Sequence, residues 1–115
     1  MDWVIKAVPE FDDWFFEQSR EDRERMTSAM ENLKNHGPAL KRPYVGKIEN
    51  SYLANMKELI PPSSDIRILF IFDPKRRAVL LLGGDKSNDF NGWYRKNIPL
   101  AEARYQRYLL EEDSK

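Results

Sequence analysis

The sequence contains no cysteine among its 115 residues. A disulfide framework, a thiolate nucleophile and a cysteine-ligated zinc site are therefore excluded. It contains a single histidine, and its carboxylates lack the spacing of a calcium- or magnesium-binding loop. Phosphate-binding loops, dinucleotide fingerprints and serine nucleophile elbows are missing as well. We therefore expect a protein that works with no metal and no other cofactor.

The sequence also lacks an apolar run long enough to span a bilayer. Its first residues, MDWVIKAVPEFDDWFFEQ, carry acids where a secretory signal carries cations. We expect a cytoplasmic protein without membrane contact. Because hydrophobic residues make up 41% of the chain and aromatic residues 12%, we also expect one packed domain over residues 1–115.

The chain has no overall excess of positive or negative charge, since its formal net charge is zero. The charges are nevertheless unevenly distributed along the chain. Residues 1–32 hold nine acids and four bases, whereas residues 33–96 hold twelve bases and six acids. The basic middle could meet a polyanion while the acidic beginning faces away from it. Ordinary surface charge would produce the same pattern, so charge alone does not decide.

Two helices are predicted after a short strand at residues 2–8. Pro9 suits the first turn of a helix in which Phe11, Trp14 and Phe15 share one face. Ser19 resembles an N-cap for a second helix, and Gly37 with the following proline marks its end. The two helices are expected to form a hairpin packed on a sheet.

Three runs of strand-forming residues follow a basic loop at 38–51, which has room for one short strand. The runs cover 52–60, 66–72 and 78–84 and are separated by PPSSD and DPKRR turns. A terminal helix is predicted from Ile98 and Pro99 onwards. These patterns predict an α+β fold, in which an antiparallel sheet of about four strands carries an N-terminal helical hairpin and a C-terminal helix.

Basic side chains are predicted to converge at one edge of this sheet. If both turns close symmetrically, Arg67 falls opposite Gly83, and Lys57 and Lys86 lie nearby. The glycine pair 83–84 would then leave room for a ligand close to the backbone. This register predicts a basic cleft.

Two of the side chains in this region allow a structural interpretation as well as a functional one. Arg67 lies inside an apolar strand, where it needs either an anionic ligand or an ion pair with Glu58 or Asp85. Trp93 could pack the terminal helix on the sheet, or it could stack on an unpaired base. Lysine and arginine around a phosphodiester can neutralise developing charge and exchange protons. RNA carries its own nucleophile, the 2′-hydroxyl, so RNA cleavage is the simplest enzymatic hypothesis.

Three segments of the chain resemble the RelE/ParE toxin superfamily, and its phage-derived HigB-like branch in particular. They are MKEL at 56–59, RILFIFDPKRRAVLLLGGDKS at 67–87 and WYRKNIPLAEARY at 93–105. The resemblance spans nearly the whole chain. It implies a toxin of a type II toxin–antitoxin module, acting as a ribosome-dependent mRNA endoribonuclease that needs no metal and leaves a 2′,3′-cyclic phosphate.

The resemblance also implies roles for individual residues. Lys57 would serve in proton transfer or phosphate binding, and Tyr94 would stack on a base or assist proton transfer. Arg67 would stabilise the transition-state phosphate, and Lys86 would supply a further cation. Contacts to RNA would come from the basic loop and from the segment after the last strand, at Lys41, Arg42, Lys47, Trp93, Arg95 and Lys96. Asn55 differs from the second lysine of some RelE-type toxins, which leaves the general base unassigned.

Two other functions stay open at this point. A ParE-type toxin inhibits DNA gyrase by binding and cleaves nothing, and an inactive module would only bind an antitoxin. Fold alone does not separate these functions. All of them imply a cognate antitoxin, expected to be HigA-like with a helix-turn-helix. The endoribonuclease hypothesis adds the ribosome and mRNA as partners.

Overall fold

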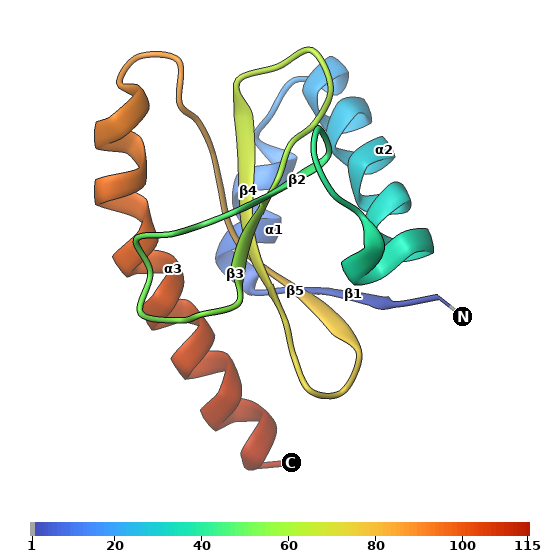
Figure 1. Ribbon diagram of the computed structural model, residues 1–115, viewed down its shortest axis with the longest axis vertical. Coiled ribbons are helices and arrows are strands. Elements are labelled where there is room, and N and C mark those ends of the chain that lie inside the picture. Colours follow the sequence, from blue (N-terminus) through green and yellow to red (C-terminus); the bar gives the residue numbers. More distant parts are fainter. Residues whose placement is uncertain (1) are drawn as a thin grey trace.

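The computed structural model describes residues 2–115 as a five-stranded sheet with helices on both faces (Figure 1). The elements are β1 (Val4–Ala7), α1 (Pro9–Phe16), α2 (Arg20–His36), the short helix η1 (Gly37–Ala39), β2 (Val45–Lys47), β3 (Met56–Leu59), β4 (Ile66–Phe72), β5 (Arg77–Asp85) and α3 (Phe90–Asp113). No helix within residues 2–115 has the length and apolar character needed to cross a membrane.

The predicted α+β class is confirmed, but the sheet has one strand more than expected and is mixed. Its order is β1-β5-β4-β3-β2, and β1 runs parallel to β5 while the other pairs are antiparallel. The extra strand is β2, which lies in the basic loop. The parallel pair joins Val4–Ala7 to Arg77–Leu80, which lie far apart in the sequence, and such long-range pairing leaves no local signal.

The helical hairpin is confirmed at both of its predicted boundaries. Pro9 lies in the first turn of α1. The Ser19 hydroxyl accepts the N–H of Asp22 at 3.1 Å and so caps α2. Gly37 ends α2 with a φ of 55°, a left-handed conformation that favours glycine.

Helix α3 begins about two turns earlier than predicted. The Asp89 carboxylate accepts the N–H of Gly92 at 3.0 Å and caps the helix there. Pro99 therefore lies inside α3, where it cannot donate a hydrogen bond to the carbonyl of Arg95. The segment carrying Trp93 and Tyr94 is helical as a result, which fixes the side of α3 from which each ring projects.

A β-bulge separates the two halves of the β4–β5 pair. Leu69 pairs with Leu82 whereas Phe70 pairs with Leu80, so Leu81 is an extra residue. The predicted register was therefore wrong by one residue at the cleft end, where Arg67 pairs with Gly84 rather than Gly83. The sequence contains no signal for a bulge in a uniformly apolar strand.

The predicted gap at the glycine pair is filled by two tryptophan rings. Gly83 and Gly84 face opposite sides of the sheet. The Trp14 indole of α1 occupies the space of a Cβ at Gly83, and the Trp93 indole of α3 occupies that space at Gly84. The expectation of open room for a ligand was wrong, because these glycines let two helices approach the sheet closely.

Alanine at Gly83 is expected to lower the free energy of unfolding by about 1–3 kcal/mol, because the added methyl group overpacks the Trp14 contact. Urea denaturation of the purified variant measures this change. A Gly83→Ala/Trp14→Leu double variant is the matched control and should recover part of the loss, since a smaller side chain then faces the methyl group. A single variant as stable as the wild type would contradict the close contact.

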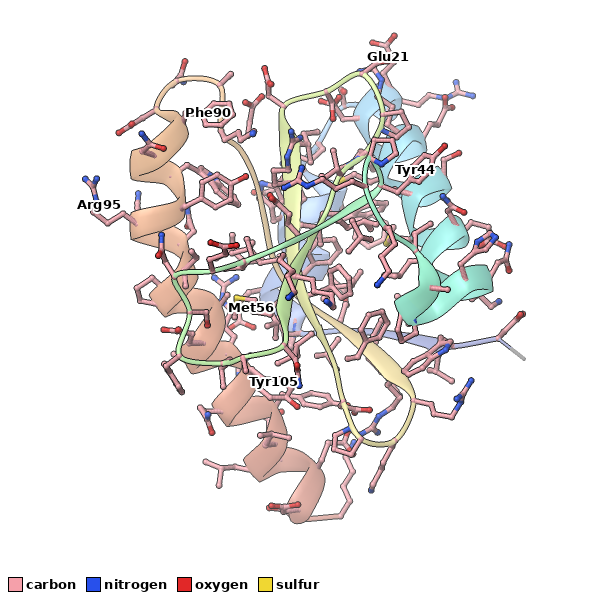
Figure 2. The ribbon with its side chains drawn as sticks, viewed as in Figure 1. Glu21, Tyr44, Met56, Phe90, Arg95 and Tyr105 are labelled. Carbon is pink, nitrogen blue, oxygen red and sulfur yellow. The ribbon has the colours of Figure 1, made fainter. Side chains whose placement is uncertain are left out.

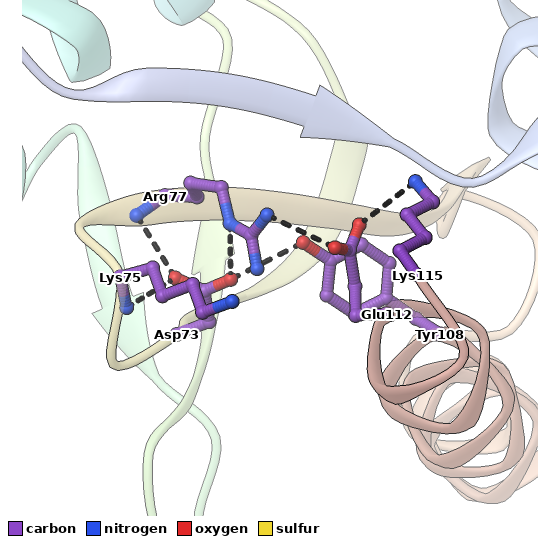
Figure 3. Close-up of polar contacts among 6 residues, drawn as sticks. All are labelled: Asp73, Lys75, Arg77, Tyr108, Glu112 and Lys115. Atoms are coloured by element: carbon purple, nitrogen blue, oxygen red, sulfur yellow. Dashed lines mark hydrogen bonds and ion pairs between the residues drawn. The ribbon is translucent and has the colours of Figure 1, made fainter.

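A carboxylate at the β4–β5 turn joins this hairpin to α3 (Figure 3). Asp73 is buried, and its Oδ1 accepts the backbone N–H groups of Lys75 and Arg77 at 2.9 and 3.0 Å. Its Oδ2 accepts the Arg77 Nε at 2.6 Å and the Tyr108 hydroxyl at 3.2 Å. The Arg77 Nη1 also lies 3.4 Å from the Glu112 Oε2. This Asp73 cluster fixes the turn and the end of α3 together.

A second ion pair joins α1 to α3. Arg107 meets the Glu10 carboxylate with both of its terminal nitrogens, the Nη2–Oε1 distance being 2.6 Å. The hydrogen bond from Arg107 lowers the pKa of Glu10 from 4.5 to about 2. Both side chains are more than a third exposed, so solvent weakens the pair.

Stability is expected to fall between pH 4.5 and pH 2 through the loss of this pair. The pKa of Glu10 is lower in the folded chain than in the unfolded one, so its contribution is present above pH 4.5 and disappears as the carboxylate is protonated. Wild type and Glu10→Gln should differ by at most about 1 kcal/mol at pH 6 and converge near pH 2. Urea denaturation at both pH values measures this, and a difference that does not change with pH would contradict it.

Candidate active site

A cleft of about 760 Å³ lies between the start of α3 and strands β2, β3 and β4. Figure 2 shows Phe90 at the first turn of α3 on the sheet side of the helix. The charged and phenolic side chains that line the cleft come from every one of these elements and from the residue after β5. They are Arg42, Lys47, Glu49, Glu58, Arg67, Lys86, Tyr94 and Arg95.

Glu58 is the buried carboxylate of the cleft. Its position opposite Gly46 in the β2–β3 pair leaves space above it, and the Arg42 guanidinium extends into that space. The Tyr94 hydroxyl donates to the Glu58 Oε1 at 2.6 Å, and the Arg67 Nε lies 3.6 Å from the same oxygen. Burial and the neighbouring carboxylate raise the pKa of Tyr94, so the phenol stays protonated and keeps donating at neutral pH.

Arg67 is held in a fixed orientation by main-chain acceptors. Its Nη1 donates to the carbonyls of Ser64 and Ile66 at 3.1 and 2.7 Å. Within residues 2–115 its Nη2 makes no hydrogen bond. The salt-bridge interpretation of Arg67 is therefore correct as far as Glu58 is concerned, and one face of the guanidinium still points to the cleft with free donors.

Lys86 is a buried amine held against aromatic rings. Its side chain has only 5% exposure, and its Nζ lies 3.4 Å from the centre of the Phe90 ring and 5.7 Å from that of Tyr94. Within residues 2–115 no carboxylate lies within ion-pair distance of this nitrogen. Burial, and then the charge of Arg67, lower the pKa of Lys86. A lysine of this kind is suited to proton transfer.

The predicted convergence of three cations is correct for Arg67 and Lys86 and wrong for Lys57. Leu59 pairs with Ile68, so Lys57 pairs with Phe70 and points to the sheet face opposite to that of Arg67. Lys57 lines a separate hollow with Lys41. The error came from neglecting the alternation of side chains along a strand, because Lys57 faces away from its neighbour Glu58 and therefore away from Arg67.

The cations predicted for RNA contact lie in several places. Arg42 and Lys47 line the cleft, and Arg95 lines its outer rim, where it points away from the sheet (Figure 2). Lys96 is exposed on α3 outside the cleft, and Trp93 packs on Gly84. Trp93 therefore packs α3 on the sheet through the ring face that covers Gly84, as the structural interpretation predicted.

Two residues of the cleft were not predicted from the sequence to contribute to it. Glu58 was considered only as an ion-pair partner of Arg67, and Phe90 was not considered. The alternation of MKEL could have separated Glu58 from Lys57, because neighbouring residues of a strand face opposite sides. Phe90 carries no such signal, because the start of α3 was placed too late.

The chain matches the model of the phage-derived Gp49-like protein family over residues 13–106. It is 46% identical over 109 residues to a Mycobacterium tuberculosis protein named "Putative toxin HigB3", and the match covers 95% of this chain and 96% of that protein. It is 40% identical over 106 residues to a second protein of that organism, "Putative toxin HigB2". That match covers 89% of this chain and 53% of the relative.

Solved structures of RelE toxins share the fold. A mutant of the Escherichia coli toxin RelE in the free state superposes with a TM-score of 0.61 and 10% identity, covering 77% of this chain and 88% of that one. The archaeal RelE–RelB complex from Pyrococcus horikoshii gives a TM-score of 0.57 and 14% identity, with 75% and 97% covered. At these identities the likeness concerns the fold alone.

Proposed function

The chain belongs to the phage-derived Gp49-like family as a HigB-like toxin of the RelE/ParE superfamily, and we propose that its cleft cleaves mRNA. The proposal rests on one observation above all. Arg67, Lys86 and the Tyr94–Glu58 pair meet in a single hollow, although they come from two strands, the segment after β5 and a helix. A carboxylate, an amine of lowered pKa and an oriented guanidinium can supply the proton acceptor, the proton donor and the charge stabilisation that metal-free phosphodiester cleavage needs.

Glu58 is the proposed proton acceptor. The 2′-hydroxyl of the RNA attacks the adjacent phosphorus, and the hydroxyl proton passes to the Glu58 carboxylate as the new P–O bond forms. The Glu58 Oε1 already accepts from Tyr94, so the Oε2 is the oxygen left for the substrate. Tyr94 thereby holds the carboxylate in place, with the Oε2 turned to the substrate.

Lys86 and Arg67 act on the other side of the reaction. As the bond to the 5′-oxygen breaks, the Lys86 ammonium gives that oxygen a proton, and the products are a 2′,3′-cyclic phosphate and a 5′-hydroxyl. The lowered pKa of Lys86 makes it a better acid than an ordinary lysine. The free Nη2 of Arg67 donates to the phosphate oxygens, where charge accumulates in the transition state. Lys57 has no part in these steps.

The proposed partners are the ribosome, its mRNA and a cognate antitoxin. The excess of basic residues in 33–96 supports docking among ribosomal RNA. The names of the Mycobacterium tuberculosis relatives as toxins, and the complex of the Pyrococcus horikoshii RelE with RelB, support an antitoxin partner. We propose a HigA-like antitoxin with a helix-turn-helix, and a cytoplasmic location for the complex.

A reconstituted translation reaction tests the proposal. Purified protein is added to it, and the 5′ ends of the mRNA fragments are mapped, with a ribosome-free reaction as the control. Cuts within the codon in the ribosomal A site that need ribosomes are the expected result. Intact mRNA would contradict cleavage, and gyrase inhibition or antitoxin binding would then be the remaining functions. Cuts that appear without ribosomes would contradict the ribosome requirement.

A further inference from the structure

A second basic hollow lies on the other side of the edge strand β2. It has a volume of about 520 Å³, and four cations line it, with Glu49 as the acidic residue among its lining residues. The cations are Lys41, Arg42, Lys47 and Lys57. We call this hollow the β2 groove. The cleft lies on the α3 side of the sheet, whereas Lys57 points to the α2 side.

The β2 groove brings four positive charges together with one carboxylate, Glu49, among its lining residues. Lys47 pairs directly with Lys57 in the β2–β3 ladder, an arrangement that is unfavourable without an anion. Within residues 2–115 none of the four cations forms an ion pair. Burial, and then the charges of Lys41 and Lys47, lower the pKa of Lys57.

The β2 groove is continuous with the cleft. Arg42, Lys47 and Glu49 line both hollows. Gly46 lies between them without a side chain, and the Arg42 guanidinium lies over it beside the Glu58 carboxylate. A polyanion bound at Arg67 can therefore pass over the edge of the sheet and reach the lysines of the β2 groove.

We propose that the β2 groove is a second phosphate-binding site, which holds the backbone of the same single-stranded RNA at nucleotides next to the cleaved one. The proposal rests on the proposed function, because it takes the cleft as the place of the scissile phosphate. RNA is favoured over an acidic protein segment by the continuity of cations from one hollow to the other, since a nucleic acid carries one charge at every nucleotide. It assigns Lys57 to substrate binding rather than to proton transfer.

Fluorescence anisotropy with two labelled RNAs tests the proposal. Both are 2′-O-methylated throughout, which removes the nucleophile, and they are three and twelve nucleotides long. The Lys41→Gln/Lys57→Gln variant removes the two lysines that line the β2 groove alone, and it should bind the long RNA at least tenfold more weakly and the short RNA within about twofold of the wild type. The slope of log K against log salt for the long RNA should fall by about 1.4, since each single-strand phosphate contact contributes about 0.7. Lys34→Gln/Lys75→Gln is the charge-matched control and should leave both RNAs unaffected.

Three outcomes would overturn the β2 groove as an RNA site. They are an unchanged affinity and salt slope for the long RNA, an equal loss on both RNAs, and wild-type protein that binds neither RNA. A polyglutamate peptide provides a further comparison. If the variant lost only peptide binding, the groove would be assigned to a protein partner instead. The cleavage proposal is judged separately by mRNA mapping, so failure of the groove proposal can be told apart from failure of the proposed function.

Discussion

Replacing Arg67 with alanine is expected to lower mRNA cleavage in the translation reaction by about 1,000-fold, the usual range for a preorganised transition-state donor. The guanidinium is oriented by the Ser64 and Ile66 carbonyls before any substrate arrives, so its donors need no reorganisation during the reaction. Quantifying the cut mRNA over time at saturating protein measures the effect. Arg67→Lys should recover only part of the rate, because lysine keeps the charge but not the fork of donors.

The stability of the variant must be measured alongside its activity. Removal of Arg67 takes away the cation closest to the buried Glu58 carboxylate, which is costly in itself. The Glu58→Gln/Arg67→Ala double variant removes both charges and is the folding control, monitored by circular dichroism and thermal melting. A folded Arg67→Ala protein that cleaves at the wild-type rate would remove Arg67 from the mechanism.

Replacing Asp73 with alanine is expected to cost about 3–5 kcal/mol of unfolding free energy, the range for breaking a buried ion pair from one side. The Asp73 carboxylate accepts four hydrogen bonds, two from the backbone of its own turn and two from Arg77 and Tyr108. Alanine leaves the Arg77 guanidinium with Glu112 as its remaining partner. Urea denaturation at pH 7 measures the loss.

Asp73→Asn is the matched variant for this measurement. Its side-chain oxygen can still accept the two backbone N–H groups, whereas its amide cannot replace the charged oxygen beside Arg77. We expect a loss between those of wild type and Asp73→Ala. If alanine and asparagine cost the same, the turn hydrogen bonds would contribute nothing, and a loss below about 1 kcal/mol for both would contradict the importance of the cluster.

Local signals in the sequence predicted the helical hairpin correctly, and nonlocal pairing explains the errors in the sheet. The proline at the start of α1, the serine cap of α2 and the glycine at its end act within a few residues of where they stand. The parallel contact between β1 and β5 joins Val4 to Arg77. No residue near Val4 indicates which strand will pair with it. The residue pattern therefore predicted a strand but not its pairing partner in the sheet.

The candidate site was predicted in part for the same reason. Arg67 and Lys86 were found because a cation inside or just after an apolar strand is unusual, whatever the register. Lys57 was misplaced because it faces away from Glu58 and Arg67 in the alternation of the strand, and the pairing of Arg67 depended on the bulge at Leu81. The alternation can be read from the sequence, whereas the bulge leaves no local signal.

The pairing of β1 with β5 also bears on the order in which the protein is made and completed. A chain emerging from the ribosome exposes β1 first, but the partner residues Arg77–Leu80 follow only after most of the sequence has been synthesised. The cleft draws on residues from Arg42 to Pro99, and α3 continues to Asp113. The nascent chain therefore has no assembled cleft until the first half of α3 has been synthesised.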